Sequence, residues 1–353
     1  MKMDRRSFLK KCSFAVGALY FSACKDDIEI EEDSVVSSIP GYYNEDNYLN
    51  NKIAYIKYLL SQEGVRDSFV FLTDPHWEFN SRQSPHLLRA IQIATGIDKI
   101  FIGGDIADGC NKDSYSFVDS IRNNWSGQVH CIVGNHEYLG PYATESVVYN
   151  LFDFNSSIQI GNHHRHYYFV DDNTIKTRYI ILSSFSESVD GGFHAVYGYG
   201  DDQLRWLEDS ALKVKEGWNI ILFTHFMYWI GLYDNKISQP VGSEGVSQLI
   251  DDYSGPGRII AVFHGHNHRD RVIRTRNTKI PVIITTCDKN VIISEEDQQN
   301  VIRPTGTIIE QAFDVVIVNE KESKIHCVRI GCPAKDGIGN NVGEDVEERI
   351  IEY

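Results

Sequence analysis

The sequence predicts an α/β fold in which buried strands alternate with helices. Short runs rich in Val and Ile recur from residue 68 onward, and such runs are typical of strands that are buried on both faces. Stretches with helical apolar spacing lie between several of these runs, which is the pattern of β-α-β units. Carboxylate, amide and imidazole side chains stand directly after the runs, where ligands collect in open α/β sheets.

Composition is typical of a globular protein and excludes a nucleic-acid-binding surface. The 353 residues are 42% hydrophobic and 24% charged, which is enough apolar content for a sizeable core. Asp and Glu number 49 against 34 Lys and Arg, so the formal net charge is −15. Neutralising phosphates needs clustered Lys and Arg residues, and no two of these residues are adjacent beyond the first eleven positions. We therefore expect no nucleic-acid partner.

The N-terminus predicts an export signal. "MKMDRRSFLKKCSFAVGALYFSAC" has a basic start and an apolar run, Cys12 to Phe21, that is too short to span a bilayer comfortably. "RRSFLK" resembles a twin-arginine signal, and "FSAC" resembles a lipobox, whose cysteine (Cys24 here) is lipidated. Phe21 stands where that pattern prefers Leu, so an ordinary cleaved signal or an uncleaved anchor are the alternatives. We expect residues 1–24 to export a bacterial lipoprotein that Cys24 anchors to a membrane, in the periplasm or at the cell surface.

The rest of the chain is predicted to be a tether and one domain. Residues 25–45 are acidic and polar, as in a tether that holds a domain off a membrane. A single domain is expected over 46–353, with core motifs in 68–270 and closing strands in 280–353.

Periodicity predicts the elements of this domain. The stretch 47–62 has helical spacing, with Ile53, Ile56, Leu59 and Leu60 on one face. Further helices are expected at 84–97 and 201–216, and a hairpin around "NEKESK" near the C-terminus. Strands are expected within 68–76, 99–108, 128–137, 178–184, 219–226, 259–268 and 281–288.

Candidate metal ligands follow these strands from separate parts of the chain. They are Asp74, His76, Asp105, Asn135, His225, His266 and His268. Carboxylate, amide and imidazole together suit borderline transition metals such as Zn, Mn or Fe. Seven ligands with one shared carboxylate are enough for two ions and too many for one.

The motifs "DPH", "GGDIAD", "GNHE", "TH" and "GHNH" occur in the order found in the calcineurin-like metallophosphoesterases, and the chain resembles that family over residues 68–270. The resemblance implies a four-layer sandwich, with two mixed β-sheets face to face and helices outside. It also implies a first metal on Asp74, His76 and His268, and a second on Asn135, His225 and His266. Asp105 takes the bridging position between the two.

The resemblance also implies a mechanism. A metal-bridging water loses its proton near neutral pH and attacks the phosphorus atom as hydroxide. His136 is the candidate general acid, and Asp108 orients and charges it. A cap or turn role for Asp108 and a purely structural role for His136 are the alternatives.

Other residues bear on the substrate. Ser/Thr protein phosphatases carry Arg-Gly after the second aspartate of "GDxxD", whereas Asp108 is followed by Gly109, which disfavours that subfamily. Trp77 and Trp229 beside the metal motifs could stack on a substrate, although packing over the sheet explains them equally well. His264 falls outside the "GHNH" pattern, and either a structural role or a substrate contact is open to it.

We expect a metal-dependent phosphomonoesterase or phosphodiesterase that acts on a small phosphorylated substrate. The alternative is a catalytically silent metal-binding or scaffold protein of the same fold. An inactive relative would be expected to lack a ligand or the general acid, and every such position is filled here.

Overall fold

The computed structural model of the chain describes residues 39–138, 160–162, 167–186, 196–227, 242–293, 300–338 and 343–353. Cys24 and the expected signal peptide lie outside these residues. The folded unit is Ile39–Tyr353, so it begins earlier than expected. Tyr43, in the 3-10 helix Gly41–Asn47, is fully buried and donates a hydrogen bond to the Glu310 carboxylate (3.3 Å). The expected tether of 25–45 therefore extends too far, because its last residues pack into the domain.

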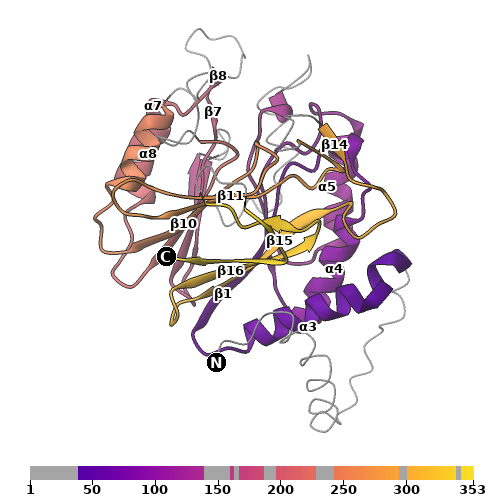
Figure 1. The fold of residues 1–353 in the computed structure, drawn as a ribbon. Coiled ribbons are helices and arrows are strands. Elements are labelled where there is room, and N and C mark those ends of the chain that lie inside the picture. The colour runs from indigo at the N-terminus through magenta and orange to yellow at the C-terminus, as the bar shows by residue number, and fades with distance from the viewer. Residues whose placement is uncertain are drawn as a thin grey trace. The chain divides into compact units, whose positions relative to one another are not determined.

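Two mixed β-sheets form the centre of the domain (Figure 1). The first sheet has the order β19-β16-β15-β1-β2-β3, and the second has the order β11-β12-β10-β9-β6-β5-β4. The strands of the first sheet are β1 (Val65–Leu72), β2 (Lys99–Ile102), β3 (Gln128–Cys131), β15 (Ala312–Asn319), β16 (Lys324–Gly331) and β19 (Glu348–Glu352). Those of the second are β4 (Ile160–Asn162), β5 (Tyr167–Asp172), β6 (Thr177–Ile181), β9 (Asn219–Phe223), β10 (Arg258–His264), β11 (Arg271–Arg274) and β12 (Pro281–Ile284).

Parallel pairing aligns the ends of the strands that precede the candidate ligands. β1, β2 and β3 are parallel neighbours in the first sheet, and β6, β9, β10 and β12 are parallel neighbours in the second. The carboxyl ends of parallel strands lie at one edge of a sheet, and ligands collect there.

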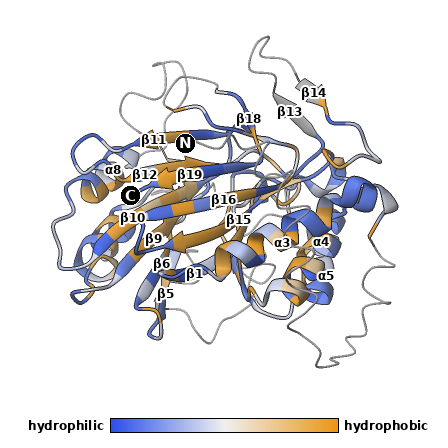
Figure 2. Ribbon diagram, turned by 60° about the horizontal axis from the view of Figure 1, so that its bottom comes forward, coloured by the Kyte–Doolittle hydropathy of each residue, from blue (hydrophilic) through white to orange (hydrophobic). Residues whose placement is uncertain are grey.

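Helices cover the outer face of each sheet, which gives four layers. On the first sheet lie α3 (Tyr48–Leu60), α4 (Ser84–Thr95) and α5 (Lys112–Asn124); on the second lie α7 (Asp201–Trp206), a π-helical turn (Leu207–Ala211) and α8 (Ser243–Asp251). Figure 2 shows many hydrophobic residues on the strands, while helices α3, α4, α5 and α8 carry both hydrophobic and hydrophilic residues. The predicted four-layer sandwich is confirmed.

Aromatic rings fill the space between the two sheets. Phe69 and Phe101 from the first sheet pack with Phe223 and Phe263 from the second, and all four are fully buried. The rings of Phe101 and Phe223 stack with centroids 3.9 Å apart. This contact joins strands that end in candidate ligands, so it fixes the two sheet edges relative to each other.

A buried ion network supports the same region. Arg329 Nε donates to Asp314 Oδ1 (2.7 Å), and Arg329 Nη2 donates to Asp270 Oδ1 (2.6 Å). Arg349 Nη2 donates to Asp314 Oδ2 (2.6 Å). Because Asp270 directly follows the "GHNHR" segment, the network ties that loop to the C-terminal strands.

Most elements lie where the sequence predicts them. Tyr48–Leu60 matches the helix expected at 47–62, and β15 and β16 form the hairpin expected around "NEKESK". The prediction did not include α5 or α8, nor the short hairpins β7–β8 (Phe185–Ser186, Val196–Tyr197), β13–β14 (Val291–Ile293, Asn300–Ile302) and β17–β18 (Ala334–Lys335, Asp345–Val346). Within the described ranges, no helix combines the length and the apolar character needed to cross a membrane.

Candidate metal centre

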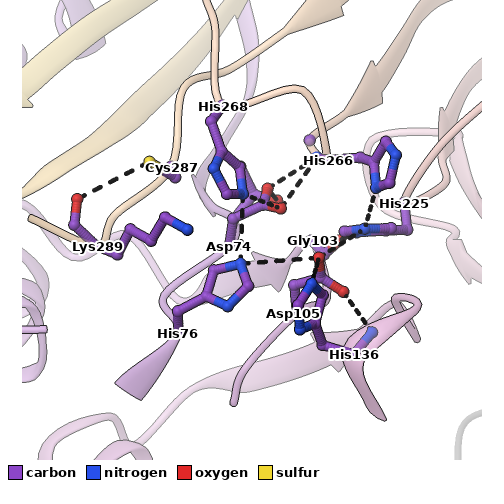
Figure 3. Close-up of polar contacts among 12 residues, drawn as sticks. Asp74, His76, Gly103, Asp105, His136, His225, His266, His268, Cys287 and Lys289 are labelled. Atoms are coloured by element: carbon purple, nitrogen blue, oxygen red, sulfur yellow. Dashed lines mark hydrogen bonds and ion pairs between the residues drawn. The ribbon is translucent and has the colours of Figure 1, made fainter. Parts of the chain in front are cut away.

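Loops at the ends of five strands bring the predicted ligands together, and Figure 3 labels all of these ligands except Asn135. Asp74 and His76 follow β1, Asp105 follows β2, and Asn135 follows β3. His225 follows β9, and His266 and His268 follow β10. The ligands therefore come from both sheets and meet where the sheet edges face each other.

One cluster consists of Asp74, His76, Asp105 and His268, whose ligand atoms all lie within 4.8 Å of one another. His76 Nε2 is 3.3 Å from His268 Nε2, and His268 Nε2 is 3.2 Å from Asp74 Oδ1. Asp74 and His76 are almost completely buried. The arrangement matches the first metal site that the sequence implies.

A second cluster consists of Asp105, His225 and His266, with Asn135 beside them. His225 Nε2 is 3.2 Å from both Asp105 Oδ2 and Asn135 Oδ1. His266 Nδ1 is 2.8 Å from Asn135 Oδ1 and 3.2 Å from His225 Nε2. Asp105 thus belongs to both clusters, as a bridging carboxylate must.

The backbone is strained at most of these ligands. The left-handed φ angles are 51° at Asp74, 37° at His76, 53° at Asp105, 64° at His266 and 52° at His268. A residue other than glycine in this region costs about 1–3 kcal/mol, and such residues cluster at ligand sites. The strain aims side chains from tight turns into a common centre, which is consistent with a built binding site.

Glycines make room for this crowding. A Cβ on Gly134 would lie 2.2 Å from Asp105 Oδ1, and one on Gly265 would lie 2.2 Å from Asp74 Oδ2. Only a residue without a side chain fits at these two positions.

The electrostatics of the cluster suit a cation. Burial would raise the pKa of both aspartates, but the neighbouring histidines outweigh it and hold the pKa of Asp74 and Asp105 below the usual range. Burial lowers the pKa of His76 to about 3 and that of His266 to about 4, so these rings are neutral and have a lone pair to offer. Ionised carboxylates with neutral imidazoles are the donors that transition metals require, so the residues present fit a metal site.

A backbone carbonyl sets the orientation of His225. Its Nδ1 lies 2.7 Å from the Gly103 carbonyl oxygen, so Nδ1 carries a proton and Nε2 faces Asp105 and Asn135. Burial would lower the pKa of His225, but the Asp105 charge outweighs it and raises the pKa to about 10. A cation bound at Nε2 would take the place of the proton that Asp105 attracts there.

His136 stands beside the clusters with its own carboxylate. Its Nδ1 hydrogen-bonds Asp108 Oδ1, and its Nε2 is 3.8 Å from Asp105 Oδ2. The imidazole is 28% exposed, and the Asp108 side chain is 48% exposed. Asp108 is held in turn by its own N–H, which donates to Glu78 Oε1 (3.0 Å). The pair therefore lies at the solvent-facing side of the centre.

Similarity to known proteins identifies the family of this chain. The sequence model of the calcineurin-like phosphoesterases matches residues 68–270, which is more than half of the chain. The chain belongs to the calcineurin-like phosphoesterase family.

Individual proteins similar to this chain share at most about a quarter of the aligned residues among those named below. A curated relative from Fibrobacter succinogenes, named as a probable cyclic nucleotide phosphodiesterase, is 24% identical over 203 residues, which cover 56% of this chain and 69% of the relative. The phosphopantetheinyl hydrolase of Mycobacterium tuberculosis aligns at 12% identity and a TM-score of 0.35, over 64% of this chain and 91% of that one. A predicted phosphoesterase of Streptococcus pneumoniae aligns at 10% identity and a TM-score of 0.34, over 81% and 97% of the two chains.

One residue of the phosphoesterase motif "GNHE" has a role that the sequence did not reveal. Glu137 is 1% exposed, and its carboxylate accepts hydrogen bonds from the N–H groups of Asp105 (3.0 Å), Ile106 (2.6 Å) and Gly134 (2.6 Å). Burial, followed by the charge of Asp105, raises the pKa of Glu137 to about 7, while the backbone donors favour its ionised form. Glu137 therefore fastens the loops after β2 and β3 to each other. The sequence signal that could have indicated this role is the position of Glu137 in the motif "GNHE".

The three residues expected to contact the substrate are Trp77, His264 and Trp229. Trp77 is 2% exposed and packs against Phe117 of α5 with ring centroids 5.1 Å apart, so the expected contact is wrong for this residue. The physical reason is that the Trp77 indole Nε1 donates to Ser116 Oγ of α5 (3.3 Å) and the ring belongs to the hydrophobic core between α5 and the first sheet. His264 is fully buried at the end of β10, which agrees with its structural alternative. Trp229 lies outside the described residues.

Proposed function

We propose that this phosphoesterase hydrolyses a small phosphorylated substrate at a dinuclear metal site with His136 as general acid. Membership of the family supports phosphoester hydrolysis in general, and the two clusters that share Asp105 support the dinuclear form. The shared Asp105 carboxylate is the main support for two ions, because one anion between two cations offsets their repulsion. We further propose that the metals are Mn, Fe or Zn, because the donors are mixed oxygen and nitrogen.

The metal ions, when bound, supply Lewis acidity to the phosphoryl group and activate a water molecule. Asp74, His76 and His268 would hold one ion, Asn135, His225 and His266 the other, and Asp105 both. His136 holds a proton on Nδ1 against Asp108, which leaves Nε2 to donate its proton to the departing oxygen.

A phosphodiester is the second substrate class to consider. The relative from Fibrobacter succinogenes is named as a probable cyclic nucleotide phosphodiesterase, and its similarity to this chain extends over 203 residues. We therefore include cyclic nucleotides among the substrates to be tested.

The test is a hydrolysis assay on purified protein with added Mn²⁺ or Zn²⁺. We expect turnover of p-nitrophenyl phosphate, bis-p-nitrophenyl phosphate or a cyclic nucleotide, and loss of that turnover in Asp105→Asn. His136→Ala should reduce the rate most where the leaving group is a poor one, since such a group needs the proton. If metal-loaded protein hydrolyses none of these, nor a wider phosphoester panel, the proposal fails and the silent scaffold takes its place.

We also propose that the protein is exported and anchored through a lipid on Cys24. The support is the sequence alone, in "RRSFLK" and "FSAC". Metabolic labelling with a fatty acid should mark the wild-type chain and not Cys24→Ser, and the variant should leave the membrane fraction. Equal labelling of both chains would contradict the anchor.

A further inference from the structure

Lys289 is a charged residue beside the site that no sequence motif places there. It lies beyond the end of β12, which pairs in parallel with β10, the strand that leads into His266 and His268. The carboxyl ends of these two strands share one sheet edge, so the segment after β12 reaches the metal centre from its own strand. No motif of the family resemblance includes this position.

The main chain around Lys289 is fastened to the first metal loop. Asp288 N donates to the Thr73 carbonyl (2.9 Å), and Lys289 N donates to the carbonyl of the ligand Asp74 (3.3 Å). The Arg303 guanidinium donates to the Lys289 carbonyl. The backbone of Lys289 is therefore held at a defined position against a metal ligand.

The next residue back along the chain strengthens this anchor. Asp288 is fully buried, and its carboxylate accepts hydrogen bonds from Ser84 Oγ (2.7 Å) and from Ala312 N (3.0 Å). Loop, helix α4 and strand β15 thus meet at Asp288. A segment held from three sides presents the Lys289 side chain from a fixed base.

The side chain of Lys289 extends toward the first metal cluster. Figure 3 shows it reaching from its own loop in the direction of Asp74, His76 and His268, with the ammonium at the near end. Figure 3 draws a contact for the Lys289 carbonyl and none for its ammonium.

An anion bound at the metal centre would be attracted to the Lys289 ammonium. Two divalent ions carry four positive charges, and the carboxylates of Asp74 and Asp105 offset two of them. The half-buried residue Lys289 adds a further positive charge on the same side, which a negative group between Lys289 and the metals would offset. A phosphoryl group with two negative charges is such a group.

We propose that Lys289 Nζ binds a non-bridging oxygen of the substrate's phosphoryl group and favours dianionic phosphomonoesters over monoanionic diesters. The proposal rests on the proposed phosphoesterase function, because it assigns a substrate contact at the same site. No covalent step is involved, since the ammonium donates a hydrogen bond and keeps its protons. Gly109, next to Asp108, offers no side chain that could take this part.

The experiment measures binding of inorganic phosphate to Mn²⁺-loaded protein by calorimetry. Lys289→Met should weaken phosphate binding roughly tenfold to a hundredfold, the usual range for a hydrogen bond to a charged group. Lys289→Arg should recover most of the affinity. Lys57→Met is the matched control, because Lys57 is exposed on α3 on the outer face of the first sheet, and it should bind phosphate like wild type.

Turnover gives the second measurement. In Lys289→Met, kcat/KM should fall more for p-nitrophenyl phosphate than for bis-p-nitrophenyl phosphate, because the first carries the larger negative charge. Unchanged phosphate affinity in Lys289→Met would overturn the proposal. So would loss of a bound metal ion in that variant, because Lys289 would then serve the metal site. If wild type binds phosphate in a Lys289-dependent way and hydrolyses nothing, this contact stands and the proposed function fails.

Discussion

Glu137→Gln should lower the free energy of unfolding by about 1–3 kcal/mol, the cost of leaving one buried backbone N–H without an acceptor. Glu137 Oε2 accepts from Asp105 N (3.0 Å) and Gly134 N (2.6 Å), while Oε1 accepts from Ile106 N (2.6 Å). Glutamine has one carbonyl oxygen in place of two. Whichever way its amide turns, at least one of the three N–H groups faces an NH₂ group and loses its partner.

The assay is equilibrium unfolding in urea at about pH 8, above the Glu137 pKa of about 7, so that the wild-type carboxylate is ionised. Glu45→Gln is the matched control, because Glu45 is exposed, and its effect should stay within about 0.5 kcal/mol. Glu137→Ala removes both oxygens and should cost more than Glu137→Gln.

The same substitution should weaken metal binding. Glu137 holds the backbone of Asp105, the residue shared by both clusters, and groups that support ligands in this way typically contribute 10–100-fold in metal affinity. Calorimetric titration of metal into both proteins measures the change. Wild-type stability together with wild-type metal affinity in Glu137→Gln would refute this reasoning, because the three hydrogen bonds would then hold nothing in place.

Three further predictions follow from the packing and charges. Gly265→Ala should abolish binding of at least one metal ion in calorimetry while the chain stays folded by circular dichroism. The added Cβ would lie 1.9 Å from Thr73 Oγ1 and 2.2 Å from Asp74 Oδ2, so the ligand Asp74 would have to move. Normal binding of two ions by this variant would contradict the prediction. Burial would raise the pKa of Asp314, but the charge of Arg329 outweighs it and holds the pKa below the ordinary 3.8. Ionised Asp314 therefore stabilises the fold above pH 3.8, and this stabilisation is lost as the pH falls through its lowered pKa. In urea unfolding, Asp314→Asn should lose less stability than wild type when the pH is lowered. Equal losses in the two proteins would contradict the role of Asp314 in the ion network. Chelation should lower the Tm by an amount that grows with the free metal concentration it removes, and a Tm indifferent to metal would argue against a site formed in the folded state.

The strands and the ligand motifs could be predicted because their signals are local. A Val/Ile-rich run followed by "DPH" or "GHNH" contains both the strand and the residues that its end presents. The parallel strands then bring separate motifs to one edge, as for Asp74 after β1 and His266 after β10.

Where prediction failed, the deciding partner lies far away in the sequence. Tyr43 lies in the segment that composition predicts to be a tether, but it packs into the core and donates a hydrogen bond to Glu310, 267 residues further along. Trp77 stands beside a metal motif, yet its ring direction is set by Phe117 on α5. Lys289 belongs to no motif and reaches the centre only because β12 pairs with β10. None of these contacts leaves a periodic or local signal.

The most direct test of the dinuclear site is a crystal structure of the Mn²⁺-loaded protein with anomalous scattering data. We predict two anomalous peaks, one beside Asp74, His76 and His268 and the other beside Asn135, His225 and His266, with the Asp105 carboxylate contacting both. A single peak at saturating metal, or two peaks that Asp105 does not connect, would contradict the account.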